Sequence, residues 1–473
     1  MEQTMINDDT IVAVSTAPGT GGIAVIRLSG RNVFDILSKC WWGKDPREMV
    51  THTAHLGKIV DSKGEALDQS VVTVFKAPRS FTGEDVAEIS CHGSRWIQRE
   101  IVNRLIECGA RPAEPGEFTR RAFMNGKMDL AQAEGVADLI ASNSRAAHAL
   151  AIKQTDGRFT GYLETLRGQL VDFASLLELE LDFSEEEVEF ADRKQLRELA
   201  DRTLRLMERL ANSYRTGKAL KEGVPVVIAG APNSGKSTLL NALLDEDKAI
   251  VSDIPGTTRD IIEDTCEIDG ILFRFVDTAG LRDTADRIER IGIDRAEARL
   301  ERAHIVLWLV DASDNGSFES SLDDIRKRIA ILPEASHLIL LNKTDLPMEI
   351  SDEDLRQPAE KGGADPTDRI GSLRISARKG IGMEELRRKL VDMASNDYNP
   401  ESDIMLTNSR HYSAVTKGIA SLRRAREALD TGLSADFIAQ DVRETLHHLG
   451  SLTGAISTPD LLATIFSRFC IGK

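Results

Sequence analysis

The chain has 473 residues, of which 41% are hydrophobic and 29% are charged, a composition typical of globular proteins. It is too long for one hydrophobic core, so we expect two to four domains. No apolar run is long enough to cross a bilayer, the N-terminal residues do not form a secretory signal, and the cysteines are scattered. We therefore expect a cytoplasmic protein without a membrane segment. The formal net charge of −16 excludes a general attraction for nucleic acid, so an RNA partner needs a local basic patch.

The character of the sequence changes along the chain. Residues 1–120 alternate short β-like runs with Gly and Pro turns, which predicts a mixed α/β domain. Residues 121–220 and 385–473 carry apolar side chains at helical spacing and predict a helical domain. Residues 221–384 return to strand–helix alternation, which predicts an α/β domain inserted into the helical one. The alternative is that the two flanking blocks are separate helical units.

A phosphate-binding loop is predicted where a buried strand leads into a helix. The run from Gly230 to Ser237 matches GxxxxGK[ST] between that strand and that helix. The alternative, a Gly-rich turn that arises by chance, would not need this strand and helix. Its backbone N–H groups and the helix N-terminus attract phosphate oxygens. We expect Lys236 to reach the β- and γ-phosphates, and the Ser237 hydroxyl to hold Mg²⁺. The expected contacts are Asn233, Ser234, Gly235, Lys236, Ser237 and Thr238.

Two loops that sense the γ-phosphate are predicted farther along the chain. A strand ends at Asp277, which can orient a Mg²⁺-bound water, and Gly280 can offer its N–H to the γ-phosphate. Before that strand, Thr258 is the candidate for a second protein ligand of Mg²⁺. The residues expected beside the nucleotide here are Ser252, Asp253, Ile254, Pro255, Gly256, Thr257, Thr258, Asp277, Thr278, Ala279 and Gly280.

The base-binding loop predicts guanine and excludes adenine. Asp345 can accept hydrogen bonds from the N1–H and the 2-amino group of guanine, and adenine has neither donor. The expected base contacts are Asn342, Lys343, Thr344 and Asp345, together with Ser376, Ala377 and Arg378 after a later strand. Four motifs in the order of a Ras-like G domain predict a GTPase.

The hydrolytic residues are less regular. Ras-like switches place a Gln soon after the DxxG motif, and residues 281–290 contain none. Other residues must then position water and neutralise charge. The candidates are Asn233, Arg259, Arg282, Asp283, Arg287 and Glu289. For most of them, the alternative is that they are exposed charged residues of a switch loop.

Motifs outside the G domain point to one family. The run 81–88 reads FTGEDVAE, the run 115–134 reads PGEFTRRAFMNGKMDLAQAE, and the chain ends in FCIGK. Together they closely resemble the bacterial tRNA-modification GTPases called MnmE or TrmE, over essentially the whole chain. The resemblance implies a folate-binding α/β domain that holds a homodimer, a helical domain, and an inserted G domain.

The resemblance also implies a reaction and its partners. Members work in a heterotetramer with the FAD-dependent protein MnmG (GidA). They add an aminomethyl or carboxymethylaminomethyl group to C5 of the wobble uridine of certain tRNAs. The carbon comes from a tetrahydrofolate derivative, in the 5-formyl or methylene form. GTP hydrolysis drives pairing and opening of the G domains, and K⁺ takes the place of an arginine finger.

Catalytic roles are expected for Lys236, from the phosphate loop, and for Arg259, from the candidates above. The resemblance adds Glu289, which it implies near the attacking water. Without the family, Asn233 would be an ordinary turn residue and Glu289 a solvated carboxylate. The implied K⁺ ligands are Asn233, Ser252, Ile254 and Thr257.

The matching folate positions lie near both ends of the chain. They are Arg27, Glu88, Lys127 and Lys473. A carboxylate suits the donor face of a pterin, and cations suit the anionic glutamyl tail; the alternative for Arg27 is a surface charge. We also hypothesise that Cys470 takes part in the modification, although a lone cysteine among apolar residues is usually part of a core.

Two rival functions stay open. One is a GTP-dependent ribosome-assembly or signalling factor, which would need neither the folate positions nor Cys470. The other is a monomeric GTPase without cation dependence, which would not need Asn233.

Overall fold

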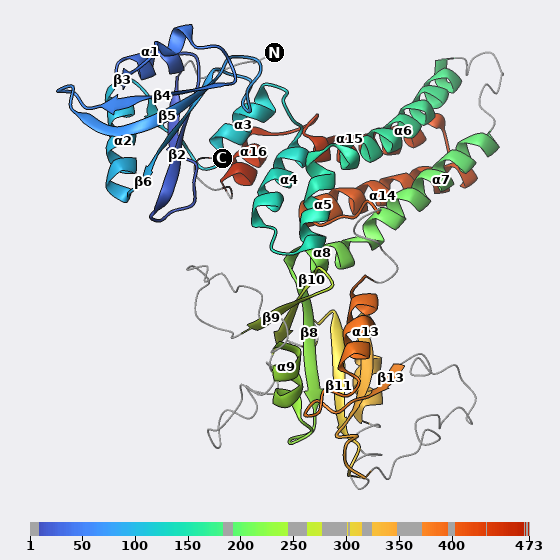
Figure 1. Ribbon diagram of the computed structural model, residues 1–473. Coiled ribbons are helices and arrows are strands. Elements are labelled where there is room, and N and C mark those ends of the chain that lie inside the picture. Colours follow the sequence, from blue (N-terminus) through green and yellow to red (C-terminus); the bar gives the residue numbers. More distant parts are fainter. Residues whose placement is uncertain are drawn as a thin grey trace, which may run out of the picture. The chain divides into compact units, whose positions relative to one another are not determined.

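The computed structural model of the chain describes residues 9–182, 193–244, 263–276, 300, 303–314, 324–347, 371–395, 403–431, 433–467, 469 and 472. Two compact units make up the chain. Unit 1 comprises Met1–Ala137, Gln154–Arg167 and Arg443–Lys473, and unit 2 comprises Asp138–Lys153 and Gly168–Val442. Figure 1 shows the helices and strands of both.

Unit 1 is built on a seven-stranded sheet in the order β3-β4-β5-β6-β2-β1-β7. Neighbouring strands are antiparallel except for β1 and β7, which are parallel. The alternating burial along β5 is the pattern of a strand with one core face. The strands are β1 (Ile11–Val14), β2 (Gly21–Ser29), β3 (Trp41–Trp42), β4 (Thr53–Val60), β5 (Ala66–Phe75), β6 (Val86–Gly93) and β7 (Arg111–Pro112).

Helices cover one face of this sheet. The helices α1 (Val33–Ser38) and α2 (Arg95–Glu107) bury Leu37, Ile101 and Leu105 against Ile26 and Ile89 of the sheet. Because side chains alternate along a strand, the opposite face carries the residues between these positions. On that face, Ile23, Trp42 and Leu56 are 71%, 58% and 65% exposed. This sheet therefore has one covered face and one largely open face.

The rest of unit 1 is helical. The helix α16 (Pro459–Phe466) begins after Thr458, whose side chain accepts a hydrogen bond from the Leu461 N–H, and Pro459 is in the first turn. It packs on α3 (Glu117–Met124), and Phe466 joins a core cluster with Leu130. Helices that contribute residues to both units are α4 (Leu130–Ala141), α5 (Arg145–Thr155), α6 (Arg158–Asp182) and α15 (Ala435–Thr453).

Unit 2 contains a six-stranded sheet in the order β13-β12-β11-β8-β10-β9. Its pairs are parallel except for β9 with β10. All but the last residue of β11 are buried, as expected for a central strand covered on both faces. The strands are β8 (Val224–Gly230), β9 (Glu263–Ile268), β10 (Ile271–Val276), β11 (Ile305–Asp311), β12 (Ser336–Asn342) and β13 (Gly371–Arg374).

Helices lie on both faces of the second sheet. On one face, α8 (Tyr214–Glu222), α9 (Lys236–Leu244) and α13 (Met383–Ser395) pack against alternate residues of β8 and β11. On the other, Leu300 and the helical residues 324–331 pack against Val227 and Trp308. Because the strands from β13 to β10 are parallel, their carboxyl ends meet at one edge of the sheet. Ligands bind at this edge in open α/β sheets.

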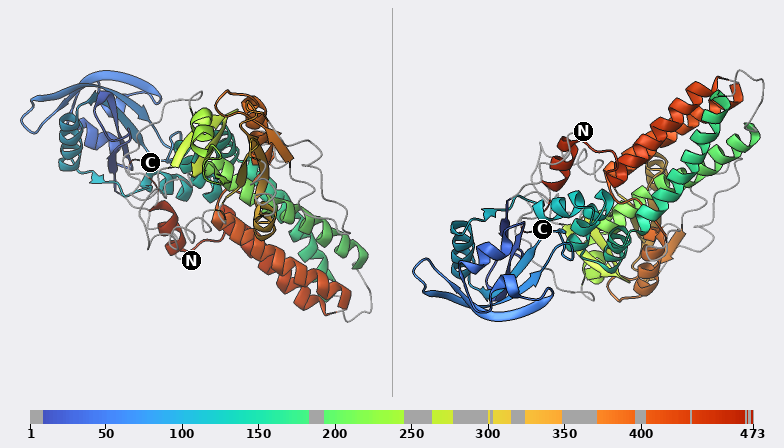
Figure 2. Two further views of the ribbon diagram at one scale, coloured as in Figure 1. Left: turned by 90° about the horizontal axis from the view of Figure 1, so that it is seen from below. Right: turned by 90° about the horizontal axis from the view of Figure 1, so that it is seen from above.

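Two long helices complete unit 2. The helix α7 (Arg193–Asn212) places Leu196, Met207 and Leu210 on its buried side, and it packs along α14 (Ser409–Thr431), as Figures 1 and 2 show. Within the described residues, no helix has the length and apolar content that crossing a membrane requires.

The predicted fold class is confirmed: the chain combines a mixed α/β part, a helical part and a P-loop α/β part. The three predicted domain ranges, 1–120, 121–220 with 385–473, and 221–384, stay predictions.

Candidate functional site

The phosphate loop connects β8, at the centre of the second sheet, to α9. Its backbone enters the left-handed region at Asn233 (φ 63°) and Gly235 (φ 103°). A Cβ atom on Gly230 would lie 2.3 Å from the Leu309 carbonyl oxygen, so only glycine allows this close approach. The glycine therefore lets the loop pass close to β11 before α9 begins.

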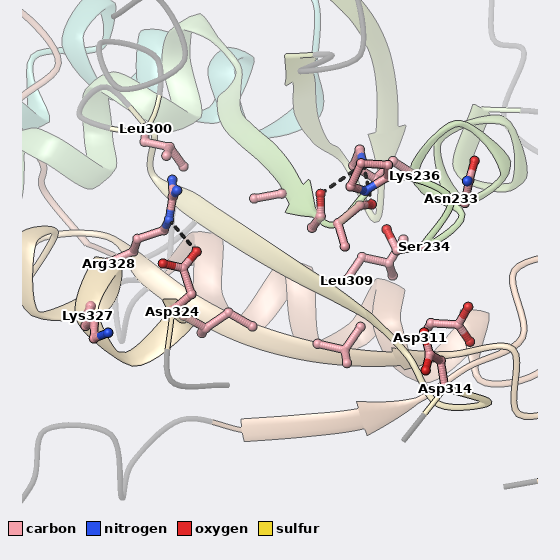
Figure 3. A pocket seen from close by; sticks show the side chains of 16 residues that line it. Asn233, Ser234, Lys236, Leu300, Leu309, Asp311, Asp314, Asp324, Lys327 and Arg328 are labelled. Atoms are coloured by element: carbon pink, nitrogen blue, oxygen red, sulfur yellow. Dashed lines mark hydrogen bonds and ion pairs between the residues drawn. The ribbon is translucent and has the colours of Figure 1, made fainter. Parts of the chain in front are cut away.

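Lys236 and the two residues after it occupy the first turn of α9. The Lys236 Nζ donates to the carbonyl oxygens of Gly230 at 3.0 Å and Ala231 at 2.8 Å, across its own loop (Figure 3). Ser237 and Thr238 are exposed. The lysine therefore lies where phosphates approach a helix N-terminus, and the Ser237 hydroxyl is accessible to a hydrated cation.

A cavity of about 980 Å³ opens beside this loop. It extends from Asn233 and Lys236 past Asp311 to Asp324 and Arg328, which form an ion pair at its far end (Figure 3). Cavities of this size hold ligands as large as nucleotides. Asn233 itself is exposed, so its amide is accessible to a ligand or a cation.

Asn342 joins the base loop to the phosphate loop. Its Nδ2 donates to the Ser234 carbonyl at 2.8 Å, and its Oδ1 accepts from the Ala377 N–H at 3.0 Å. A Cβ atom on Gly235 would lie 2.3 Å from the same Nδ2, which explains the glycine there. One buried amide therefore sets the spacing between three predicted nucleotide loops.

Asp345 is exposed at the end of this loop and held by one neighbour. The Ser376 hydroxyl donates to Asp345 Oδ1 at 2.7 Å. This hydrogen bond lowers the pKa of Asp345, so the group is a carboxylate at neutral pH. An oriented, ionised acceptor is what recognition of guanine N1–H and 2-amino groups requires. Thr344 is tied through its N–H to the Ile375 carbonyl at 3.2 Å, and Arg378 is exposed beside the loop.

Lys343 takes the left-handed conformation (φ 66°), and its ammonium forms an ion pair with Asp311 at the end of β11. Asp311 was not among the predicted site residues. The signal that could have found it is an acidic residue that ends an otherwise apolar strand, at the edge where the other nucleotide loops begin.

In unit 1, the structure brings Arg27 and Glu88 together. They are opposite each other on β2 and β6, on the open face of the sheet. Arg27 Nε and Nη2 both donate to Glu88 Oε1, at 2.9 and 2.8 Å. The guanidinium also lies 5.5 Å from the ring centre of Phe81 and 5.8 Å from that of Phe118. This pair therefore marks the border between the open part of the face and the part covered by aromatic rings.

Lys127 lies after α3 and contacts the loop that carries Phe81. Its Nζ donates to the Pro78 carbonyl at 3.1 Å, and its methylene chain packs on Gly83. Lys127 also lines a cavity of about 550 Å³ together with Glu164 and Arg167. Two of the three basic folate candidates, Arg27 and Lys127, therefore contact the 78–84 loop.

A buried ionic cluster supports the same loop, and sequence reasoning missed it. Arg121 donates to Glu84 at 3.3 Å and to Asp9 at 2.7 Å, and Arg111 donates to Glu117 at 2.5 Å. Glu117 is fully buried, and Arg121 is 7% exposed. The spacing of Glu117 and Arg121 by four residues could have signalled an ion pair on a helix. The FTGED and PGEFTRR motifs are thus tied to each other by charge.

Gly472 packs on β1. The Ser15 hydroxyl donates to the Gly472 carbonyl at 3.1 Å, and a Cβ atom on Gly472 would lie 2.3 Å from the Val14 carbonyl oxygen. Val14 pairs with Ile26, next to Arg27 on β2. Gly472 therefore lies beside the strand pair that carries Arg27.

The remaining predicted residues lie outside the part of the chain that the structure describes. They are Ser252, Asp253, Ile254, Pro255, Gly256, Thr257, Thr258, Arg259, Asp277, Thr278, Ala279, Gly280, Arg282, Asp283, Arg287, Glu289, Cys470 and Lys473.

Comparison with known proteins agrees with this geometry. Two family models match the chain, "MnmE helical domain" over residues 130–470 and "GTP-binding protein TrmE N-terminus" over residues 10–127. Proteins named "tRNA modification GTPase MnmE" are similar over almost their whole length. That of Christiangramia forsetii is 45% identical and covers 98% of this chain and 99% of its own. Those of Parabacteroides distasonis and Bacteroides fragilis are 48% and 47% identical, covering 98% and 99% of this chain and 100% of theirs. The chain belongs to the MnmE (TrmE) family of tRNA modification GTPases.

Proposed function

We propose that this chain is a GTPase that acts in the modification of the wobble uridine of tRNA. The observation that carries the proposal is the arrangement around Asn342, whose amide holds the phosphate loop at Ser234 and the base loop at Ala377. Ser376 holds Asp345 at the same edge of the sheet. This edge therefore offers hydrogen-bond donors to phosphate oxygens and, in Asp345, an acceptor that suits guanine. The names of the similar proteins supply the tRNA substrate class.

In hydrolysis, the residues of this chain bind and orient. Lys236 turns from the loop carbonyls to the phosphates, and the α9 N-terminus adds positive potential. Ser237 is the described residue that would hold Mg²⁺, and its exposed hydroxyl fits that role. When bound, Mg²⁺ neutralises charge on the β- and γ-phosphate oxygens. The second expected ligand, Thr258, and the expected catalytic residues Arg259 and Glu289 lie outside the described residues.

Potassium stimulation belongs to the same proposal. Asn233 is exposed at the turn of the phosphate loop, and an amide oxygen is a ligand that a hard cation accepts. A monovalent cation near the β–γ bridge would offset developing charge as an arginine finger does. The other expected ligands, Ser252, Ile254 and Thr257, are not among the described residues.

We further propose that unit 1 binds a tetrahydrofolate derivative beside Arg27 and Glu88. Arg27 engages only Oε1 of Glu88, and within the described residues no hydrogen bond reaches Oε2. That oxygen can accept from the amino and amide donors of a pterin. Lys127, with Arg167 in the same cavity, suits the anionic glutamyl tail. Lys473 and Cys470 remain expected members of this site, and Gly472 supports them because it lies beside the same strands.

The partners follow from the open sheet face and from the family. Isolated exposed apolar residues are ordinary, but Ile23, Trp42 and Leu56 share one face of one sheet, which suits burial against a second copy of the chain. We propose a homodimer through this face, and a heterotetramer with the FAD-dependent MnmG.

One experiment tests the core of the proposal. GTP and ATP hydrolysis by the full chain would be measured in KCl and in NaCl at equal ionic strength, with Asn233→Ala as the matched variant. We expect hydrolysis of GTP only, with a rate in potassium that Asn233→Ala reduces to the sodium rate. Hydrolysis of ATP at the same rate would refute the GTPase. Equal rates of the unaltered chain in both salts would refute only the cation role.

A further inference from the structure

The loop that would recognise the base, residues 342–345, is fixed at each of its ends. Asn342 is tied to Ser234 and Ala377, and Asp345 is tied to Ser376. Between them, Lys343 has a φ of 66°, a conformation that costs free energy in a residue other than glycine. Such a conformation persists where surrounding contacts hold it, and among the described residues the side chain of Lys343 is held by Asp311.

Asp311 is itself rigidly placed. It is the last residue of β11 and is opposite Asn342 in the parallel pair β11–β12. Its Oδ1 accepts from the Ser313 N–H at 3.0 Å and from the Ser313 hydroxyl at 2.6 Å, and Oδ2 accepts from Lys343 Nζ. The Ala312 N–H donates to the Asn342 carbonyl at 2.9 Å. The carboxylate is therefore fixed by its own strand end, and it can hold the ammonium in one position.

The Asp311 side chain is 20% exposed and that of Lys343 is 33% exposed. Burial on its own raises the pKa of Asp311, but the hydrogen bonds from Lys343 and Ser313 lower it, so the group is ionised near neutral pH. Asp311 also lines the cavity beside the phosphate loop, at the same end as Ser234 (Figure 3). The carboxylate that holds Lys343 thus belongs to the wall of the cavity beside the phosphate loop.

We propose that Asp311 is a positioning residue for guanine-nucleotide binding, which acts by holding the ammonium of Lys343 away from the base plane. With its ammonium fixed, the methylene chain of Lys343 is ordered before the nucleotide arrives and offers an apolar surface next to Asp345. A free lysine would lose its rotamer freedom on binding, and that loss would weaken affinity. The inference rests on the proposed GTPase function and concerns the same site.

This role makes the effect of Asp311 specific to the base. Asp311 contacts the base loop and no atom of the phosphate loop among the described hydrogen bonds. Replacing it should therefore weaken a ligand that carries a base and leave a ligand that binds only the phosphate loop unchanged. Inorganic pyrophosphate is such a ligand, because it offers phosphate oxygens and no base.

The test measures equilibrium binding of GDP, and of pyrophosphate by competition, to the full chain with Asp311→Asn and Asp311→Glu. The matched control is Asp138→Asn, because Asp138 forms a similarly exposed ion pair with Lys221 at 2.7 Å in the same unit, away from the nucleotide loops. We expect Asp311→Asn to weaken GDP about tenfold and to change pyrophosphate by less than about twofold. Asp311→Glu should recover part of the affinity, and Asp138→Asn should bind GDP as the unaltered chain does.

A second measurement separates positioning from general damage to the fold. In a chain that already carries Lys343→Met, adding Asp311→Asn should weaken GDP no further, because the residue it holds is gone. Steady-state hydrolysis should show a raised KM for GTP at an unchanged kcat. Equal loss of GDP and pyrophosphate binding, or additive effects of the two substitutions, would overturn the inference. An unaltered chain that fails to prefer GDP over ADP would overturn the proposed function as well.

Discussion

Arg121 donates to Glu117, one turn before it in α3, with 3.0 Å between Nη2 and Oε1, and the side chain of Glu117 is fully buried. Arg111 binds the same carboxylate from β7, and Arg121 also reaches Glu84 and Asp9. A buried carboxylate with several cationic and N–H donors is stable only as a complete set, because removing one member leaves another charge unpaired. The cluster therefore ties α3, β7 and the loop at Glu84 into one body.

The first prediction concerns the stability of unit 1 at acidic pH. Burial on its own raises the pKa of Glu117, and the hydrogen bonds from Arg111, the Glu114 N–H and Arg121 lower it to about 2, from an ordinary value of 4.5. Because the folded pKa is depressed, the stabilisation is complete above about pH 4.5 and is lost as the pH falls toward 2. We expect unit 1 to lose about 3 kcal/mol of its free energy of unfolding over that range.

Hydrogen exchange of peptides from α3 measures this loss, since two-state unfolding of the whole chain is not expected. Glu117→Gln should destabilise unit 1 by about 3 kcal/mol at pH 7 and flatten the acid dependence. The matched control is Glu107→Gln, whose partner Arg104 lies at 3.0 Å but whose side chain is 60% exposed. The control should cost less than about 0.5 kcal/mol. Equal protection of α3 in both variants would contradict the prediction.

The second prediction concerns guanine recognition. Asp345→Asn replaces an acceptor with an amide that can donate to the O2 of xanthine but cannot accept both guanine protons. We expect affinity for GDP to fall at least about a hundredfold and affinity for XDP to rise. Ser376→Ala should weaken GDP by about tenfold, because Asp345 loses the hydroxyl that orients it.

Fluorescence titration with labelled GDP and XDP measures both effects. Ser372→Ala, at the exposed start of β13, is the control and should bind GDP normally. A Ser376→Ala chain with unchanged GDP affinity would show that the hydroxyl does not orient the carboxylate in the complex.

The third prediction concerns folate. Glu88→Gln keeps the shape of the side chain but removes the charge that accepts from a pterin, so we expect 5-formyltetrahydrofolate to bind about tenfold more weakly. Arg27→Met removes the group that holds Glu88 Oε1 and should weaken folate as well. Calorimetric titration of the full chain measures the affinities. Gln98→Ala, on the α2 side of unit 1, is the control. Binding of folate to both variants with unaltered affinity would place the folate site elsewhere.

The fourth prediction concerns the C-terminal segment. Gly472 has a φ of 93° and no room for a Cβ atom beside Val14, so Gly472→Ala should displace this segment from β1. We expect weaker folate binding and faster hydrogen exchange in β1. Gly161→Ala is the control, because a Cβ atom there meets nothing within 4 Å and alanine favours a helix. Unchanged folate affinity in Gly472→Ala would separate the C-terminal segment from the site.

The nucleotide loops could be predicted from the sequence because each is a short continuous run at the end of a strand. The spacing of Gly230, Gly235 and Lys236 contains the whole turn, and the order of the loops follows from the parallel sheet. Where two segments meet across the fold, the sequence contains no local signal. The pairing of Lys343 with Asp311 joins residues 32 positions apart, and Arg121 meets Asp9 over a separation of 112.

The contact between two of the folate candidates could not be predicted from the sequence either. Arg27 and Glu88 were matched to a family separately, and nothing in their spacing indicated that they are cross-strand neighbours. The PGEFT and FTGE runs marked the family, but their physical role in a buried ionic cluster depends on tertiary packing. Patterns of residue type predict loops and faces, whereas contacts between distant loops depend on how the sheet is assembled.

The contact between Ser15 and Gly472 joins residues separated by 457 positions, within one compact unit. During synthesis the first strand of unit 1 leaves the ribosome long before the segment that packs on it. The packing on β1 is therefore complete only after Gly472 has been made. A chain that stops before Gly472 would carry its nucleotide loops without the segment that packs on β1.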